Sequence, residues 1–199
     1  MNKGTLGMAE RLDSNEKDAR VPTRADAVKA ALQQTIARFQ RNANAARLVF
    51  RAETELNEGV CCVGKVRNFA PLTIDEPPDL GGGNAGMCPV ELILVALGTC
   101  QEVMYAAYAS VMGIRLDRVA VKVKGHLDAR GLLSLDGSTP MGFQKITYET
   151  KLESPADPLT LRQLVQTVET HCPVLDTLVR AIEVSGKVSI NGIEMENAA

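Results

Sequence analysis

The stretch that decides the fold is residues 81–113, GGGNAGMCPVELILVALGTCQEVMYAAYASVMG, in which a glycine-rich loop leads into one long apolar segment. Pro89 fits the first position of a helix, where its missing N–H needs no partner, and this makes Cys88 the N-cap. Gly113 is a typical residue to end the helix. The pattern therefore predicts a helix over residues 89–112.

The middle of this predicted helix carries a cysteine, Cys100, with polar residues directly after it. Gln101 and Glu102 are the only strongly polar residues in the interior of the segment, so we expect a buried core helix rather than a membrane span. Gly98 costs about 1 kcal/mol of helix propensity at such a position, which indicates close approach by another backbone or a ligand. Cys100 is either a small core residue or a reactive thiol.

Composition excludes several classes of function. The chain has 199 residues, 45% of them hydrophobic, with a net charge of −2 and no dense basic run, so we expect neither a nucleic-acid partner nor a membrane surface. The N-terminal stretch has no apolar signal segment, and we expect a cytoplasmic protein. Five cysteines in a reducing compartment argue against a disulfide framework, and their spacing with two histidines predicts no metal site.

Periodicity elsewhere predicts an α+β fold with a largely antiparallel sheet around the long helix. A helix as apolar as 89–112 needs more cover than the few strands of one protomer provide, so we also expect a homodimer formed through it. The other predicted elements are an amphipathic helix from an N-cap at Thr23 to about residue 42, strands 48–56 and 60–69 joined as a hairpin, a long loop 70–87, strands 119–124 and 145–152, a helix from Pro158 capped by Asp157, a short helix 174–180, and a last strand 182–190.

Cys172 is the second candidate for thiol chemistry. Pro173 suits the start of a new helix, which would place the Cys172 sulfur among unpaired N–H groups and lower its pKa. A small buried residue at a helix junction is an equally good interpretation. Cys88 has a similar position before Pro89, but twelve helical residues separate it from Cys100 by roughly 18 Å, which is beyond disulfide reach.

Arg67 is the third candidate. Alternation along strand 60–69 places it on an apolar face with Cys61, Val63 and Phe69, where a guanidinium needs an anionic partner. The alternative is an edge-strand arginine that reaches solvent. A further motif, Gly81-x-Gly83-x-x-Gly86, matches the dinucleotide fingerprint as a string, but no βαβ unit surrounds it, so we expect no nucleotide site.

Several short motifs together resemble the family of osmotically inducible protein C and organic hydroperoxide resistance protein, over about residues 45–192. They are Asp75-Glu76-Pro77, Gly81-Gly82, Pro89-Val90-Glu91-Leu92, Leu97-Gly98-Thr99-Cys100 and Cys172-Pro173-Val174. The resemblance implies an OsmC-like intertwined α+β homodimer whose active site lies at the subunit interface. It also implies a division of the chain into an N-terminal tail with an appended helix, 1–44, and an OsmC-like domain, 45–199.

In this family one cysteine is peroxidatic and a second is resolving, while an arginine and a glutamate hold the thiolate. The resemblance assigns these roles to Cys100, Cys172 and Arg67. The glutamate that directly follows the proline in the hydroperoxide-resistance pattern is Val90 here, and helical spacing turns the neighbouring Glu91 away from Cys100.

The implied function is a thiol-dependent peroxidase that reduces organic hydroperoxides through a Cys100–Cys172 disulfide, which an external dithiol then reduces. Such a site needs no metal or bound cofactor. The departure at Val90 leaves an alternative, in which the scaffold has little peroxidase turnover. It would instead bind a small hydrophobic ligand or partner near Cys100.

Overall fold

The structure, a computed structural model, describes residues 22–195, and its central element is the long helix α2, Pro89–Met112. The helix begins and ends where the sequence predicts. The backbone N–H of Cys88 donates to the Glu91 carboxylate at 2.9 Å, and Gly113 takes a left-handed φ of 71° that closes the last turn. The predicted unit 1–44 lies partly outside the described residues, and its boundary stays a prediction.

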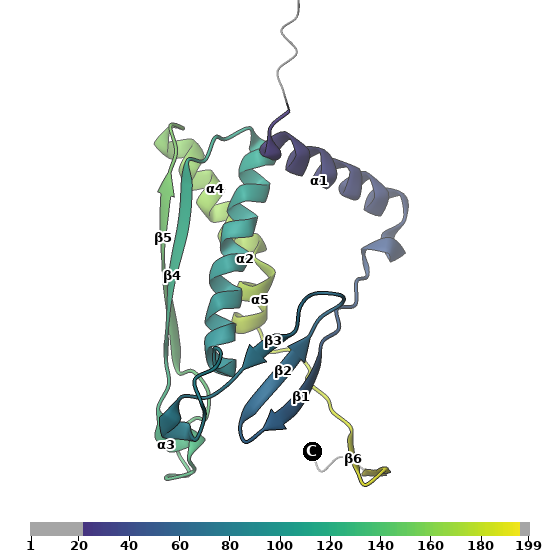
Figure 1. The fold of residues 1–199 in the computed structure, drawn as a ribbon. Coiled ribbons are helices and arrows are strands. Elements are labelled where there is room, and N and C mark those ends of the chain that lie inside the picture. The colour runs from purple at the N-terminus through teal and green to yellow at the C-terminus, as the bar shows by residue number, and fades with distance from the viewer. Residues whose placement is uncertain (1–21, 196–199) are drawn as a thin grey trace, which may run out of the picture.

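Three elements pack against α2 and form the body of the molecule. The antiparallel ribbon of β4 (Arg118–His126) and β5 (Lys145–Glu153) runs along one side of the helix, and α4 (Pro158–His171) and α5 (Pro173–Val179) contact it as well (Figure 1). Asp157 caps α4 by accepting the N–H groups of Leu159 and Thr160, as predicted. Gly98 allows β4 to approach closely, since a Cβ there would lie 3.3 Å from Val123.

The hydrophobic core lies between α2, α4 and the β4–β5 ribbon. Its fully buried members are Tyr105, Ala109, Leu164 and Val168, and partly buried residues of the ribbon pack around them. Only one stripe of α2 is buried, which contains Leu97, Gly98, Gln101, Tyr105 and Ala109. The single chain therefore leaves most sides of α2 uncovered, as expected from the few strands of one protomer.

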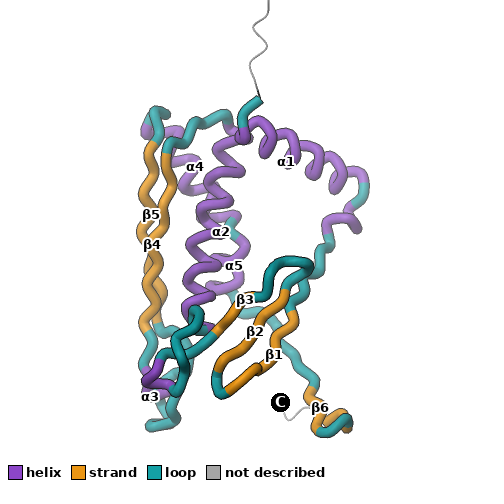
Figure 2. Tube along the Cα trace, in the orientation of Figure 1, coloured by secondary structure: helices purple, strands orange, loops and turns teal. Residues whose placement is uncertain are grey.

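The N-terminal half forms a second layer. Helix α1 (Arg24–Arg41) starts at the predicted Thr23 cap, contacts α2, and leads through a 3₁₀ turn (η1, Ala43–Ala46) into an antiparallel sheet of β1, β2 and β3 (Figure 2). The strands are β1 (Glu53–Glu58), β2 (Cys61–Lys65) and β3 (Leu72–Ile74).

The predicted strand bounds are wrong in this sheet. Pairing of β1 with β2 extends only to Glu53 opposite Lys65, so residues 48–52 have no partner strand. Beyond Lys65 the chain turns at Arg67, whose φ is +50°, and this turn ends the strand that was expected to reach residue 69. β3 and a short 3₁₀ helix, η2 (Pro78–Leu80), lie within the predicted loop.

The C-terminal segment is a short hairpin rather than the single predicted strand 182–190. β6 (Val188–Ile190) pairs with β7 (Ile193–Met195) through Asn191 and Gly192, both with positive φ, the signature of a type I′ turn. All six paired residues are exposed, and the hairpin stands away from the body (Figure 1). A helical turn, α3 (Ala129–Leu132), also interrupts the predicted loop after β4.

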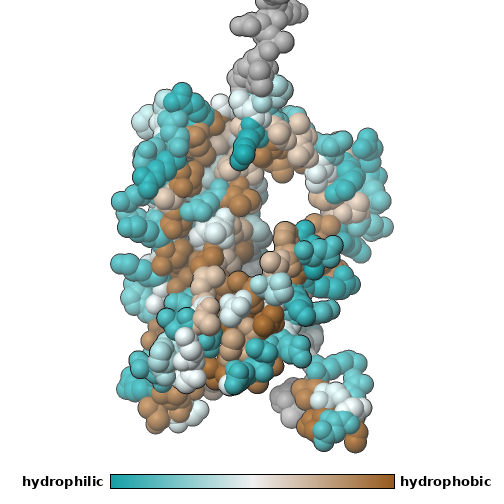
Figure 3. All heavy atoms as spheres, viewed as in Figure 1, coloured by the Kyte–Doolittle hydropathy of each residue, from teal (hydrophilic) through white to brown (hydrophobic). Residues whose placement is uncertain are grey.

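Large apolar side chains remain exposed on the described part of the chain. Figure 3 shows them gathered over α2 and the neighbouring ribbon, where Val103 is 64% exposed. By length and composition α2 also passes the test for a membrane span, a test that core helices pass as well. The fold is thus a mixed helix-and-sheet structure with antiparallel sheets and one long helix, which confirms the predicted class.

Candidate thiol site between helices α2 and α5

The structure brings two of the three predicted site residues together. Cys100 is half-buried in the middle of α2, and Cys172 is 1% exposed at the junction of α4 and α5. Pro173 cannot continue α4, so the chain takes an extended conformation at Cys172 (φ −74°, ψ 112°) and restarts as α5. Packing of α5 on α2 then brings the Cys172 side chain close enough to Cys100 to influence its pKa.

The surroundings of Cys100 favour its protonated form within one chain. Burial raises the pKa of the Cys100 thiol above its ordinary value of 9.0, and the neighbouring Cys172 raises it further. The backbone N–H of Val174, in the first turn of α5, acts in the opposite direction. The sequence suggested that N–H groups at the start of this helix lower the pKa of Cys172. In the structure one of them lowers the pKa of Cys100 instead.

The structure agrees with the second interpretation of Arg67, in which its side chain faces solvent. It lies in the exposed turn after β2, not on the apolar face of the strand, and its guanidinium stacks 4.5 Å above the ring centre of Phe69. Within residues 22–195 no arginine is among the groups that shift the pKa of Cys100. A single chain therefore does not join Arg67 to the thiol pair.

Neither nearby glutamate of α2 is free to take the place that Val90 leaves. The Glu91 carboxylate caps the start of the helix through the Cys88 N–H. Glu102 accepts the backbone N–H of Val121 at 3.1 Å and so ties α2 to β4. The sequence did not predict the contact between Glu102 and Val121, although Glu102 stood out as a polar residue in an apolar helix.

A polar cluster beside the thiols was missed at the sequence level. The Tyr148 hydroxyl on β5 donates to the Glu169 carboxylate on α4 at 3.3 Å. Burial raises the pKa of Tyr148, and negative charge at Glu169 and at Cys172 raises it as well, whereas the Gln101 amide lowers it. Gln101 is 1% exposed, and neither of its amide atoms has a close hydrogen-bond partner within residues 22–195.

The glycine-rich loop is held to its own backbone. Asp75, 3% exposed, accepts the N–H groups of Glu76, Gly83 and Ala85 at 2.9–3.0 Å, and these bonds, that of Ala85 foremost, lower its pKa. A Cβ at Gly82 would lie 1.8 Å from the Glu76 carbonyl oxygen. The glycines thus allow the backbone of the loop to pack closely against itself. Residues 22–195 contain no group of His, Cys, Asp or Glu suited to hold a metal ion.

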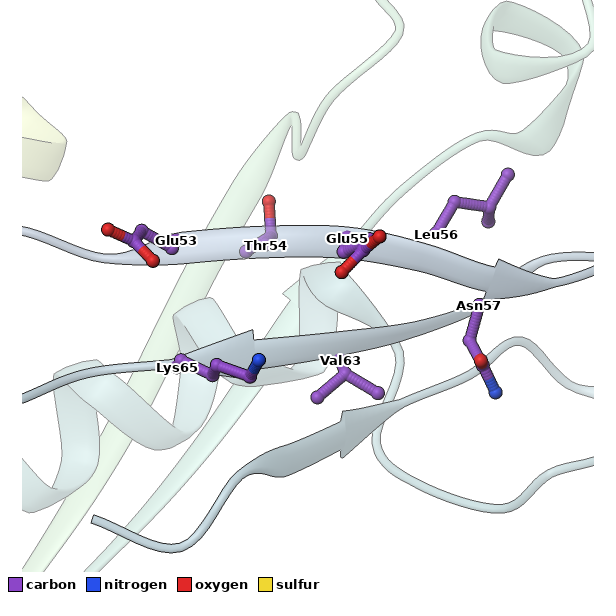
Figure 4. A pocket seen from close by; sticks show the side chains of 7 residues that line it. All are labelled: Glu53, Thr54, Glu55, Leu56, Asn57, Val63 and Lys65. Atoms are coloured by element: carbon purple, nitrogen blue, oxygen red, sulfur yellow. The ribbon is translucent and has the colours of Figure 1, made fainter. Parts of the chain in front are cut away.

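The cavities on the described surface include one on the β1–β2 hairpin and one beside α2. The larger, about 470 Å³, lies on the β1–β2 hairpin and is lined by Glu53, Thr54, Glu55, Leu56, Asn57, Val63 and Lys65 (Figure 4). The smaller, about 260 Å³, lies between α2 and β4, and its lining includes Gly98, Thr99 and Glu102. The second cavity therefore borders the part of α2 that carries Cys100.

Comparison with known proteins identifies the family. Residues 81–187, more than half of the chain, match the OsmC-like protein family. The chain belongs to the OsmC-like family. The matched span begins at the glycine-rich loop and includes α2, both members of the thiol pair and the β4–β5 ribbon. The resemblance seen in the sequence motifs is thus confirmed.

Solved structures share the OsmC-like fold at low sequence identity. An OsmC-like protein from Mycoplasma pneumoniae superposes with a TM-score of 0.57 at 19% identity, over 66% of this chain and 88% of that one. An OsmC-like protein of unknown function from Vibrio cholerae gives 0.54 at 10% identity (66% and 94% coverage). A hypothetical protein from Aquifex aeolicus gives 0.52 at 20% (67% and 89%). No curated protein matches the sequence significantly.

Proposed function

We propose that this OsmC-like chain is a cysteine-based peroxidase acting on organic hydroperoxides, an assignment carried by the contact between Cys100 and Cys172. A Cys100 thiolate attacks the O–O bond, the alkoxide leaves and takes a proton to become an alcohol, and Cys100 becomes a sulfenic acid. Cys172 then displaces hydroxide, which leaves as water, and a disulfide forms. An external dithiol reduces this disulfide by exchange. Residues 22–195 supply both thiols of this scheme.

We further propose that two copies intertwine. The β6–β7 hairpin stands apart from its own body with all six residues exposed, and β1 is exposed along its whole length. Val103 of α2 is 64% exposed in the single chain. A second copy would cover these exposed surfaces, of which those of the hairpin and Val103 carry apolar side chains. Arg67 does not contact the thiol pair of its own chain. In such a dimer it would lie near the thiol pair of the other copy.

Sedimentation and light scattering test the assembly. We expect a mass of two chains for the wild type, and Val103→Glu should shift it toward one. Leu135→Glu is the matched control, because Leu135 is equally exposed (69%) but lies in the loop after α3. A stable wild-type monomer at micromolar concentration would exclude the intertwined dimer.

Stoichiometric oxidation tests the enzyme assignment. One equivalent of an alkyl hydroperoxide should consume two thiols of the reduced protein and yield a Cys100–Cys172 linkage in peptide maps. Cys100→Ser should abolish peroxide consumption, and Cys172→Ser should leave a Cys100 sulfenic acid that dimedone traps. Cys88→Ser, which changes a thiol at the distant start of α2, should behave like the wild type. Intact thiols after prolonged exposure would refute the assignment.

A second candidate function rests on the cavity of about 260 Å³ between α2 and β4. Its walls are largely apolar, from residues such as Leu94, Val95 and Val123, which suits a small hydrophobic ligand. This function predicts that a Cys100→Ser protein still binds the ligand. A panel of small apolar dyes, read by fluorescence, tests it, and loss of binding in that variant with the fold intact would count against it.

A further inference from the structure

The cavity of about 260 Å³ between α2 and β4 has few polar groups in its walls, and these decide which ligand it fits. Leucine and valine side chains form most of the lining, and Thr99 and Glu102 supply its only polar side chains. Its volume lies below the roughly 300–1,000 Å³ that is usual for pockets of drug-sized ligands, which indicates a smaller molecule. The inference rests on the second candidate function and concerns the chemical class of its ligand.

The Glu102 carboxylate is fixed at one oxygen and free at the other. Its Oε1 accepts the backbone N–H of Val121 on β4 at 3.1 Å. Within residues 22–195, Oε2 accepts no hydrogen bond, and no lysine, arginine or histidine forms an ion pair with Glu102. Glu102 is also half-buried, so its charge is only partly solvated. A carboxylate held in this way is a pre-organised acceptor for a positively charged donor.

Thr99 provides a second hydrogen-bond acceptor in the same wall. Its hydroxyl donates to the backbone carbonyl oxygen of Val95 at 2.7 Å, so its oxygen is left only to accept. Thr99 lies three residues before Glu102, a spacing that places both side chains on one face of α2. A ligand with N–H donors and a positive charge satisfies both groups, whereas Glu102 repels a carboxylate or another anion.

The remainder of the cavity suits a short hydrocarbon chain. Leu94 of α2 and Val121 and Val123 of β4 contribute apolar side chains, so burial of such a chain between them is favourable. Gly98 leaves this space open, because a Cβ at that position would lie 3.3 Å from the Val123 side chain. The best match is therefore a molecule with an apolar body and one cationic end.

This cavity is separate from the thiol pair. Glu102 follows Cys100 by two residues, which corresponds to about 200° around a helix, so the two side chains leave α2 in nearly opposite directions. Cys100 is not among the residues that line the cavity. Ligand binding here can therefore be measured in the reduced protein without any change of the thiols.

We propose that the cavity binds a small apolar amine in its protonated form. The ammonium group donates to Oε2 of Glu102 and to the hydroxyl oxygen of Thr99, and the hydrocarbon chain lies against Leu94, Val121 and Val123. Oε1 of Glu102 keeps its bond to Val121, so binding requires no rearrangement between α2 and β4.

Three probes with the same hydrocarbon chain test this charge preference: hexylamine, hexanol and hexanoate. Each is titrated at pH 7 into the full-length reduced protein, and backbone amide chemical shifts report both affinity and location. We expect the amides of Val121 and Val123 to shift. Hexylamine, which is protonated at this pH, should bind at least about tenfold more tightly than hexanol, and hexanoate more weakly than hexanol.

Two variants separate ligand binding from the structural bond of Glu102. Glu102→Gln removes the charge but keeps an oxygen that can accept the Val121 N–H, so hexylamine should lose its advantage over hexanol while slow exchange of the Val121 amide persists. Thr99→Val removes the second acceptor and should weaken hexylamine but not hexanol. Glu149→Gln changes an exposed glutamate of β5 outside the cavity and should retain the wild-type preference.

The outcomes distinguish this proposal from the function on which it rests. Hexanol binding at Val121 and Val123 without a preference for hexylamine, or an unchanged preference in both Glu102→Gln and Thr99→Val, would overturn the amine assignment alone. If none of the three probes shifts these amides, the hydrophobic-ligand function of this cavity is wrong, and the amine assignment with it.

Discussion

Replacing Arg67 with alanine offers the sharpest test of how Cys100 becomes reactive. In one chain burial raises the pKa of Cys100 above its ordinary value, so the protonated thiol dominates at pH 7. A cation within about 4–6 Å lowers such a pKa by roughly one to three units, which raises the thiolate fraction at pH 7 by about tenfold or more. If a second copy supplies Arg67, the variant should lose this factor.

The assay is the pH dependence of iodoacetamide alkylation at Cys100, read site by site in peptide maps. Because the thiolate is the nucleophile, a raised pKa moves the midpoint to higher pH and slows alkylation at pH 7. We expect Arg67→Ala to slow it at least about tenfold. Arg51→Ala is the matched control, an exposed arginine in the same N-terminal layer. Identical midpoints for wild type and Arg67→Ala would refute the reasoning.

Three further predictions concern the scaffold of the site. Leu164→Ala should lower the free energy of unfolding by about 2–5 kcal/mol in urea titrations, because Leu164 is fully buried, whereas Leu159→Ala on the exposed face of α4 should change it by less than about 0.5 kcal/mol. Asp75→Ala should speed amide exchange at Gly83 and Ala85. Since its folded pKa is lowered from 3.8, the stability that Asp75 contributes should be complete above that value and decline as pH falls through the lower one. Glu102→Ala should expose the Val121 amide to exchange, and unchanged protection there would contradict the bond to β4.

The elements that the sequence predicted well carry their own local signals. Pro89 and Gly113 define the ends of α2, and Asp157 with Pro158 defines the start of α4, because caps depend on residues within one turn. The alternating residues of β4 and β5 were also sufficient, since one face of that ribbon packs on α2. For these elements short-range patterns and burial indicate the same structure.

The elements that were missed depend on partners distant in sequence. Strand β2 was predicted to reach residue 69, but its pairing with β1 ends at Lys65, before the turn at Arg67, which an alternating pattern alone does not reveal. Asn191-Gly192, by contrast, is a strong hairpin signal that could have divided the predicted last strand. The contact between Cys100 and Cys172 followed from the family resemblance, whereas nothing in the sequence linked Tyr148 to Glu169, which lie 21 positions apart.

The dimer and the chemistry of Cys100 are linked by the direction of its pKa shift. A second copy that only covers the exposed face of α2 buries Cys100 further, and burial alone raises its pKa beyond the increase already present in one chain. A dimer with no cation near Cys100 would therefore keep this thiol protonated and unreactive. A dimer whose Cys100 has a pKa above 9.0 supports the ligand-binding function, and a dimer whose Cys100 has a lowered pKa supports the peroxidase. The two measurements together separate functions that the fold alone leaves equal.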